Sequence, residues 1–384
     1  MIYSLPYILI IVILGVLAFY HHSQEDEDVK KNINFVCMGI IIFFFGFRGF
    51  ICDDWITYYP AFQKCDWDSI NINLFDSRRE YFEPGFMLLM NICKSIYDDF
   101  QFLVFVCTCI NTALLYRFLK KRISCIPLGF LLYLCFGGYL MNTNLMRNSI
   151  AILVFINSLE FIEERRPLPY FLLCLLALSF HVSAILYFPL YFFFHMKCNK
   201  WLYLAIFVAG NIIFLMRIPI LLTLISHFIG GAGERLQMMI ESYTEGDYGE
   251  MASTISIGYL ERLLTGILIF CYYEKLSDIR QENGVFINAF IGYFVMTFFL
   301  SEFLILSQRL AGLFTFAYWI LWYDLVKCFA IENNKRLFMA FLTLYCMMKM
   351  VGLTNMKTSE YDNVLFGAKS YEERLFIHEQ NDNK

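Results

Sequence analysis

Residues 1–22 read MIYSLPYILIIVILGVLAFYHH. Most of these residues are apolar, and as a helix the run is long enough to cross the roughly 30 Å hydrocarbon core of a bilayer. No basic segment precedes the run, and no small-x-small cleavage motif follows it. We therefore predict a retained membrane span rather than a signal peptide that is removed.

Similar apolar runs recur along the whole chain. Hydrophobic residues make up 59% of the 384 positions, whereas soluble domains average about 45–50%. A soluble core has no room for this much apolar surface, but lipid tails accept it. The sequence therefore predicts an all-α, polytopic transmembrane protein, with residues 1–353 as one membrane domain and 354–384 as a C-terminal tail.

Charge and cysteine content exclude two other classes of protein. The net charge of −4 is small and gives no basic surface for nucleic acid. Most of the 13 cysteines lie inside apolar runs and are expected to act as small hydrophobic residues. No CxxC pair or Cys/His cluster indicates a metal site, so we expect neither a metal nor another cofactor.

The hydropathy pattern predicts about 12 spans. The expected spans lie near 3–20, 34–51, 100–118, 124–141, 146–162, 168–180, 182–196, 201–216, 257–275, 283–303, 309–328 and 336–353.

Lys and Arg in short loops predict the orientation, because such loops stay in the cytoplasm. The most basic loops contain residues 117–122, 163–166, 197–200, 275–280 and 327–336. All of them are cytoplasmic at once only if 82–97 is an outer interfacial or re-entrant helix. Both termini then face outward, and the outer face holds the tail and two long loops, 52–99 and 217–256.

The first outer cluster of polar residues follows the second predicted span. Arg48 ends the span, Asp53 and Asp54 follow five and six residues later, and Tyr58 and Tyr59 come next. An arginine fork suits a phosphate, and a carboxylate suits a hydroxyl proton or a cation. The alternative is a solvated loop with an arginine that snorkels to the headgroups.

Three further clusters lie at outer edges. Glu83 precedes a proline at a predicted helix start, where an acid is ordinary capping chemistry; alternatively, it faces the same outer cavity as Asp54. Arg147 and Asn148 lie among amide and hydroxyl side chains that suit an anionic, hydroxyl-rich ligand. His181, in apolar sequence at an outer turn, is either a base or a structural histidine.

These clusters are distant in sequence but fall on one face of the membrane in the predicted topology. The residues concerned are Arg48, Asp54, Glu83, Arg147, His181 and Arg309. Their agreement, rather than any single cluster, predicts an outer site.

The chain resembles the EpsG family, the Wzy-type polymerases of exopolysaccharide, capsule and O-antigen, over about residues 1–366. The motifs are FRGFICDDWITYY (47–59), FEPGF (82–86), LMRNSIA (145–151), FHVSAIL (180–186) and, more weakly, RLAGLFTFAY (309–318) and TSEYDNVLF (358–366). Asn148 stands where the family usually has Gln. Related polymerases resemble the GT-C class of glycosyltransferases, so the resemblance implies a GT-C-like fold.

The resemblance also implies an activity. A growing glycan on undecaprenyl diphosphate would be transferred to a lipid-linked oligosaccharide repeat unit at the outer face of the bacterial cytoplasmic membrane. The expected partners are this donor and acceptor, membrane lipid, a flippase and a chain-length regulator, and no nucleic acid.

In this reaction negative charge builds up on the leaving diphosphate and the acceptor hydroxyl loses a proton, so the candidate residues can be given roles. The candidates to stabilise the leaving diphosphate are Arg48, Arg147 and Arg309. As the base for the acceptor hydroxyl, Asp54 and His181 rank ahead of Glu83. The residues expected to bind sugar are Trp55, Tyr58, Tyr59 and Asn148.

Two rival functions remain open at this stage. A flippase or transporter of the same lipid-linked sugars would need charges inside its spans, along a path between the two faces. A membrane O-acyltransferase that modifies the polysaccharide would need an acyl donor reachable from the cytoplasm. A purely structural scaffold fits the ordered motifs least.

Overall fold

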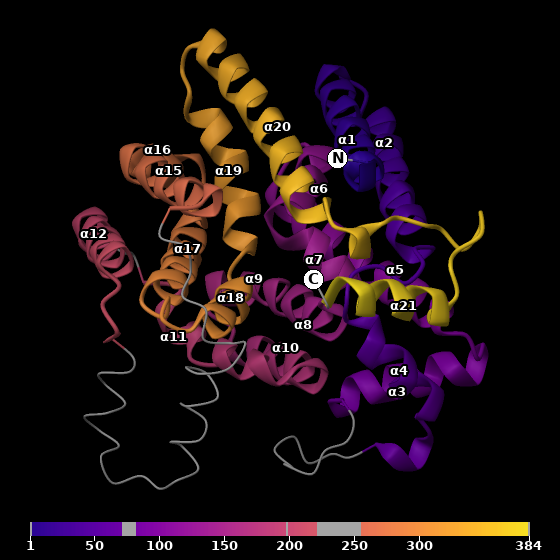
Figure 1. Cartoon of the computed structure of the whole chain (residues 1–384). Helices are drawn as coiled ribbons and strands as arrows, with labels where there is room; N and C mark the ends of the chain where they lie inside the picture. The colour runs from indigo at the N-terminus through magenta and orange to yellow at the C-terminus, as the bar shows by residue number, and fades with distance from the viewer. Residues whose placement is uncertain (1, 71–81, 197–198, 221–254, 383–384) are drawn as a thin grey trace, which may run out of the picture. The chain divides into compact units, whose positions relative to one another are not determined.

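The computed structural model describes residues 2–70, 82–196, 199–220 and 255–382. The chain divides into two compact units, one of Met1–Tyr191 with Ile331–Lys384, the other of Phe192–Ala330. Both are built from helices (Figure 1). Most of the predicted outer loop 217–256 lies outside the described residues.

The helices of the first unit are α1 (Leu5–Ser23), α2 (Glu27–Ile41), α3 (Trp55–Lys64), α4 (Pro84–Ile96), α5 (Phe100–Arg122), α6 (Ile126–Tyr133), α7 (Tyr139–Thr143), α8 (Met146–Ile156), α9 (Leu159–Glu163), α10 (Pro167–Phe180), α20 (Glu332–Thr354) and α21 (Tyr371–Asp382), with α11 (Leu190–Phe193) at the boundary. A 3₁₀ helix, η5 (Val182–Tyr187), follows α10, and a π-helical turn, η2 (Ile42–Gly46), continues α2.

The first unit is formed by an N-terminal and a C-terminal segment of the chain, which pack against each other. Helix α1 packs against α2, α6 and α20, although α20 lies more than 300 residues later. Helix α8 packs against α5 and α10, and α4 packs against α5 and α10.

The second unit contains α12 (Lys200–Met216), α15 (Ile257–Cys271), α16 (Tyr273–Ile279), α17 (Asn283–Phe298), α18 (Leu304–Gly312) and α19 (Phe316–Cys328). Helix α17 packs against α12, α18 and α19. At one end of α19 the fully buried Asp324 accepts a hydrogen bond from Arg280, at 2.8 Å, and another from Asn283, at 3.1 Å.

Five helical stretches among the described residues are long and apolar enough to span a bilayer. They are Ile2–Ser23, Glu27–Gly46, Phe100–Arg122, Ile126–Thr143 and Glu332–Thr354. The bent pair α18 and α19, with 62° between them, raises the number to six if it forms one span. The protein is therefore an all-helical, polytopic membrane protein, as predicted, but the structure does not show the expected 12 spans. The larger number included shorter apolar helices such as α10, α12 and α17.

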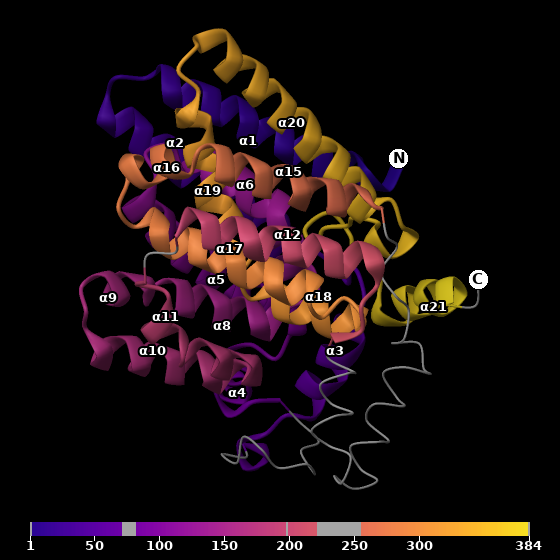
Figure 2. The same ribbon diagram turned by 90° about the vertical axis from the view of Figure 1, so that its left-hand side faces the viewer.

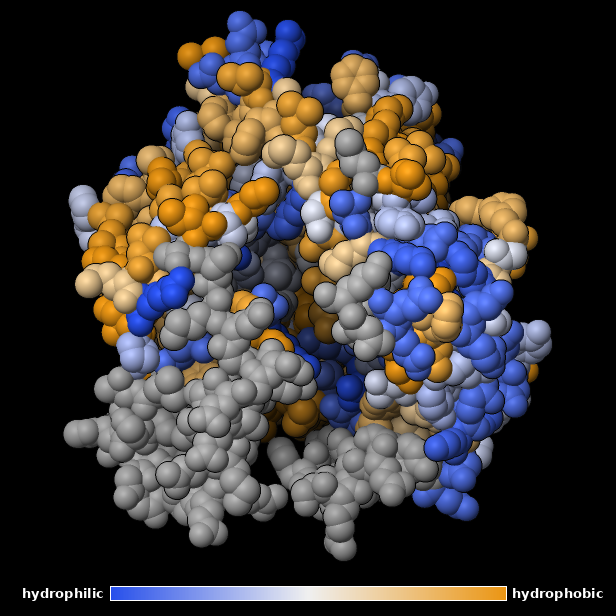
Figure 3. Space-filling view, viewed as in Figure 1, coloured by the Kyte–Doolittle hydropathy of each residue, from blue (hydrophilic) through white to orange (hydrophobic). Residues whose placement is uncertain are grey.

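The surface of the first unit also suits lipid. Large apolar side chains of α1 and α20 face outward, including Leu5, Leu9, Val16, Phe19, Leu337, Leu344 and Met348. Figure 3 shows a largely hydrophobic surface over these helices and a hydrophilic surface over α21. Since exposed leucine and phenylalanine cost little in hydrocarbon, this surface is typical of spans with a lipid-facing side.

The predicted basic loops 117–122 and 163–166 lie at one end of the first unit. Arg117 pairs with Glu160 at 2.9 Å, and Arg122 pairs with Glu163 at 2.8 Å. Helix α8 leads into α9 at this end, and α10 starts from it (Figure 2). The start of α8 and the end of α10 therefore lie together at the opposite end, where α4 contacts α10.

Candidate functional site

Arg147 and Glu83 form an ion pair at this opposite end of the first unit. Arg147 is the second residue of α8, and its Nη1 donates to Glu83 Oε2. Its Nε donates to the Tyr58 hydroxyl at 3.0 Å, and its guanidinium lies 4.3 Å from the centre of the Phe82 ring. The side chain of Arg147 is 23% exposed, whereas that of Glu83 is 5% exposed. The cation thus keeps access to solvent while its counterion is buried.

Both carboxylate oxygens of Glu83 are engaged. Although Glu83 is the N-cap residue of α4, its side chain does not cap that helix. Oε2 binds Arg147, and Oε1 accepts the backbone N–H of Val182 at 3.1 Å. Burial by itself raises the pKa of Glu83, but the Arg147 charge and the backbone N–H groups hold that pKa below the usual value. Glu83 is therefore a stable carboxylate at neutral pH.

A glycine allows this contact between α4 and the end of α10. A Cβ added to Gly85 would lie 2.8 Å from the carbonyl oxygen of Ser179, closer than ordinary van der Waals contact. Since Ser179 precedes Val182 by only three residues, the close approach brings Glu83 within reach of the Val182 N–H. The FEPGF and FHVSAIL motifs are thus partners in one packing contact.

His181 and Ser183 extend this contact to α8. His181 is the N-cap of η5, and its Nδ1 accepts the backbone N–H of Ser183 at 3.2 Å. A nitrogen that accepts carries no proton, so the neutral ring has its proton on Nε2. The Ser183 hydroxyl lies 2.7 Å from the same Nδ1 and 3.3 Å from Asn148 Oδ1, so it links His181 to Asn148. We call the whole set the Arg147 network; its members are Tyr58, Glu83, Arg147, Asn148, His181 and Ser183.

Arg48 lies in a separate, buried environment. It is 2% exposed, its Nε donates to the Asn142 carbonyl at 3.0 Å, and its Nη2 donates to the Thr143 carbonyl at 3.5 Å. These carbonyls end α7, and a cation is favourable at a helix C-terminus. In this position Arg48 holds α7 against the segment that leads to α3.

The segment around Arg48 pairs with the C-terminal part of the chain. Gly49 N donates to the Asp362 carbonyl at 3.1 Å, and Val364 N donates to the Phe47 carbonyl at 2.8 Å. A Cβ on Gly49 would lie 2.9 Å from Asp362 Cγ, so a larger residue there would displace the Asp362 side chain. The FRGF and EYDN elements are therefore structural partners.

Helix α21 also binds this region. Arg374, buried at 2% exposure, pairs with Asp362 at 2.7 Å. His378 Nε2 lies 3.1 Å from Asp53 Oδ1, and Asp53 also contacts Asn144. Asp54, by contrast, is half-buried at the start of α3, where its side chain does not cap the helix.

The predicted sugar-binding aromatics differ in exposure. Trp55 is buried, and its Nε1 donates to the Cys52 carbonyl at 2.8 Å. Tyr58 is buried beneath Arg147. Tyr59 is half-exposed and stacks on Tyr371 of α21, with 4.5 Å between ring centres.

Segments of four of the quoted motifs thus meet in the first unit, through the contacts of the Arg147 network. The sequence model of the EpsG family matches residues 31–365. This chain belongs to the EpsG family. Membership assigns this multi-pass helical membrane protein to polysaccharide biosynthesis. Comparison with curated proteins and with solved structures gives no match.

The structure brings some predicted site residues of this EpsG family member together and leaves others apart. Arg147, Glu83, His181, Asn148 and Tyr58 belong to one network. Arg309 is exposed near the end of α18 in the second unit, whose position relative to the first is not determined. The sequence-based prediction that Arg309 shares a site with Arg48 and Arg147 is therefore untested by the structure.

Sequence reasoning missed several contacts of this EpsG member. Ser183 lies inside a quoted motif, and its spacing of two residues from His181 is the signal that was available. Phe82 adjoins Glu83 and could have been noticed as an arginine-stacking ring. Arg374 lies beyond every quoted motif, so no signal pointed to its pairing with Asp362.

Among the described residues no group of three or more His, Cys, Asp and Glu could hold a metal ion.

Proposed function

We propose that this protein is a polysaccharide polymerase. It transfers a growing glycan from undecaprenyl diphosphate to a lipid-linked oligosaccharide repeat unit at the outer face of the bacterial cytoplasmic membrane. The observation that supports this most is the Arg147 network, in which residues of four family motifs surround one partly exposed arginine. A GT-C-like arrangement with about 12 spans is part of the same proposal.

A cation beside the leaving group would stabilise the negative charge that develops on the diphosphate during the proposed reaction. The bond between the anomeric carbon of the donor glycan and its diphosphate oxygen breaks, and the electron pair leaves with the diphosphate. Arg147 is suited to stabilise this charge because its guanidinium is held by Glu83 and Tyr58 and still reaches solvent. Arg309 is a further proposed diphosphate ligand, whereas Arg48, expected from sequence to be one, is buried with its guanidinium on the carbonyls of α7 and is proposed to position this region instead.

The acceptor hydroxyl must lose its proton as its oxygen bonds the anomeric carbon. Glu83 is a poor base because both of its oxygens are engaged and its pKa is lowered. His181 Nδ1 already accepts the backbone N–H of Ser183, so this nitrogen is engaged and is a poorer candidate for the base. Asp54, half-buried one helical turn before Tyr58, is the proposed base.

The arrangement of basic residues supports the proposed orientation. The Arg147 network lies at one end of α8 and the basic loops at the other, about 16 Å apart along an 11-residue helix. Loops rich in Lys and Arg remain in the cytoplasm. The network then faces the exterior, where lipid-linked repeat units are polymerised.

The test uses purified full-length protein in detergent with lipid-linked repeat units alone. A ladder of products that differ by one repeat unit supports the polymerase. Arg147→Ala should abolish the ladder, whereas Arg117→Ala, on α5 where it pairs with Glu160 of α9, should retain it. Unchanged units that cross a liposome membrane in a protein-dependent way would instead identify a flippase.

A further inference from the structure

Helix α3 presents two adjacent faces to different parts of the first unit. Trp55 and Tyr59 are four residues apart and share one face of the helix. Asp54, whose backbone is also α-helical, and Tyr58 have the same spacing and share the next face. This second face serves the Arg147 network, because the Tyr58 hydroxyl accepts a hydrogen bond from Arg147 Nε at 3.0 Å. A rotation of α3 about its axis would therefore move Asp54 and Tyr58 together.

Tyr371, the first residue of α21, packs on the face that carries Trp55 and Tyr59. Its ring stacks on Tyr59, with 4.5 Å between ring centres and 23° between the planes, and it meets Trp55 edge-on at 5.4 Å. It also meets Phe50 edge-on at 5.9 Å, in the segment that leads to α3. Stacked and edge-on rings have preferred arrangements, so these three contacts define the orientation of the helix face. Tyr371 therefore opposes rotation of α3.

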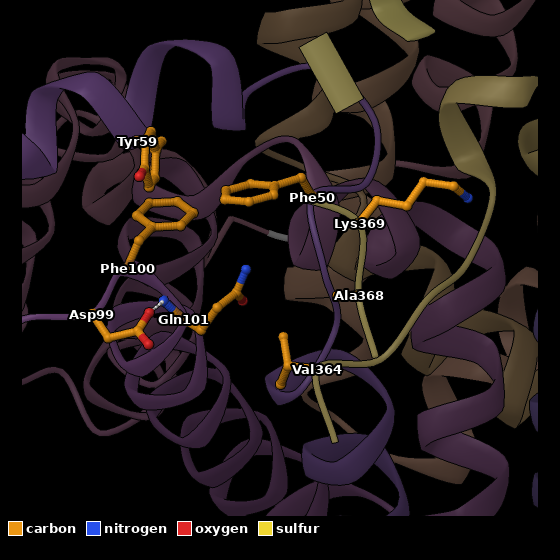
Figure 4. A pocket seen from close by; sticks show the side chains of 8 residues that line it. All are labelled: Phe50, Tyr59, Asp99, Phe100, Gln101, Val364, Ala368 and Lys369. Carbon is orange, nitrogen blue, oxygen red and sulfur yellow. Dashed lines mark hydrogen bonds between the residues drawn. The ribbon is translucent and has the colours of Figure 1, made fainter. Parts of the chain in front are cut away.

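A cavity of about 320 Å³ adjoins Tyr59 on this side of the helix. Figure 4 shows the residues that line it, which come from α3, from the segment before it, from the start of α5 and from the C-terminal segment: Phe50, Tyr59, Asp99, Phe100, Gln101, Val364, Ala368 and Lys369. Side chains that face unfilled space lose packing contacts there. The stack with Tyr371 is therefore a large part of what fixes the Tyr59 side of α3.

Helix α21 has an anchor of its own, which does not depend on α3. Arg374 is 2% exposed and pairs with Asp362 at 2.7 Å. The Asp362 carbonyl accepts the backbone N–H of Gly49, so this anchor ends in the segment that contains Arg48. The pair of His378 with Asp53 contributes less, because the Asp53 carboxylate is 56% exposed. The anchored helix is thus a support from which Tyr371 acts on α3.

We propose that Tyr371 is a positioning residue, which acts through α3 to hold Tyr58 against Arg147 and to fix the direction of Asp54. The match to the family model ends at residue 365, before α21 begins, so this residue lies outside the matched region. The effect on catalysis rests on the proposed function, whereas the coupling of Tyr371 to Arg147 does not. Since a misplacement of about 1 Å can cost about 10²-fold in rate, loss of the Tyr371 ring should lower kcat roughly 10- to 100-fold and change KM less.

The first measurement follows the Arg147 Nε–H resonance by NMR, in the full-length protein in detergent with isotope-labelled arginine. This resonance is the one that Arg147→Lys removes. Tyr371→Ala should shift it, because the hydrogen bond from Arg147 to Tyr58 changes when α3 turns. Tyr371→Phe keeps the ring and should leave the resonance at its wild-type position. Phe376→Ala is the matched control on the same helix, since Phe376 is 61% exposed, and it should shift nothing.

The second measurement is kcat and KM in the ladder assay, where kcat should fall in Tyr371→Ala and recover in Tyr371→Phe. An unmoved Arg147 resonance in folded Tyr371→Ala would overturn the proposal even if wild type makes ladders. Equal losses of kcat in the Ala and Phe variants would also overturn it, because the ring would not be what matters. A shifted resonance, with no ladder from wild type, would uphold the coupling and overturn the polymerase. If gel filtration shows that Tyr371→Ala does not fold, Tyr371→Leu, which keeps apolar volume without a ring, is judged by the same outcomes.

Discussion

Glu83 pairs with Arg147 across 64 residues of sequence, and the pair joins the start of α4 to the start of α8. The carboxylate is almost wholly buried, whereas the guanidinium keeps contact with solvent. Glu83 therefore holds the Arg147 guanidinium in one position while part of the guanidinium stays accessible to solvent. The arrangement therefore leaves one side of a rigid cation available to an anionic ligand.

Replacement of Arg147 should remove activity. We expect Arg147→Ala to lower the rate of ladder formation about 10²- to 10³-fold, the usual cost of one lost electrostatic stabiliser. Arg147→Lys should recover little, because an ammonium cannot donate in two fixed directions to Glu83 and Tyr58. Activity of the Ala variant within a few-fold of Arg117→Ala would contradict the diphosphate role.

The two neighbouring aspartates should differ in effect. Asp54→Asn should slow polymerisation about 10²- to 10⁴-fold, because it removes the proposed base. Asp53→Asn should change the rate little, because Asp53 is not the proposed base and its carboxylate contacts the side chains of Asn144 and His378. Initial rates for both variants at equal expression provide the comparison, and equal losses would argue against Asp54 as the base.

Gly85 should tolerate no larger residue. Gly85→Ala places a Cβ 2.8 Å from the Ser179 carbonyl oxygen, so α4 must shift. We expect a loss of about 1–3 kcal/mol in unfolding free energy. Gly39→Ala on α2 is the control, because a Cβ there meets nothing within 4 Å. Thermal unfolding in detergent measures both, and a Gly85→Ala protein as stable as Gly39→Ala would show that α4 and α10 are not in this contact.

Stability should depend on Glu83 under acidic conditions. The pKa of Glu83 in the folded protein lies below its ordinary value of 4.5, so the unfolded state binds the proton more readily. The stabilisation is therefore complete well above pH 4.5 and is lost as the pH falls through the lower, folded pKa. We expect the melting temperature of wild type to fall over this range more steeply than that of Glu83→Gln. Parallel curves for the two proteins would exclude this linkage.

Much of the architecture could be predicted from local sequence. The apolar run at the N-terminus, the helix from Phe100 and the one that ends at Thr354 were predicted as spans, and in the structure each is a helix long and apolar enough to cross a bilayer. Helix α4 was expected as a non-spanning helix near 82–97, and it is absent from the candidate spans. The number of spans was harder to predict, because hydropathy cannot tell a short buried helix from one that crosses the bilayer.

The pairings within the site could not be predicted in this way. Sequence singled out Glu83 and Arg147 separately, but Asp54 was the carboxylate ranked first for chemistry. Which acid meets the arginine depends on the contact of Gly85 with Ser179, and this contact joins segments that are far apart along the chain. Likewise, the pairing of Gly49 with Asp362 brings the C-terminal tail against the segment that contains Arg48.

The sequence by itself determined that this is a helical membrane protein with polar motifs at the edges of its apolar segments, because hydropathy and charge are properties of each local stretch. Only the tertiary structure decided that Arg147 belongs with Glu83, that Arg48 is buried against helix carbonyls, and that α21 covers the segment around Asp53. These relationships arise from the packing of segments that are distant in sequence, and at Gly85 the missing Cβ allows α4 to approach the backbone at Ser179 closely.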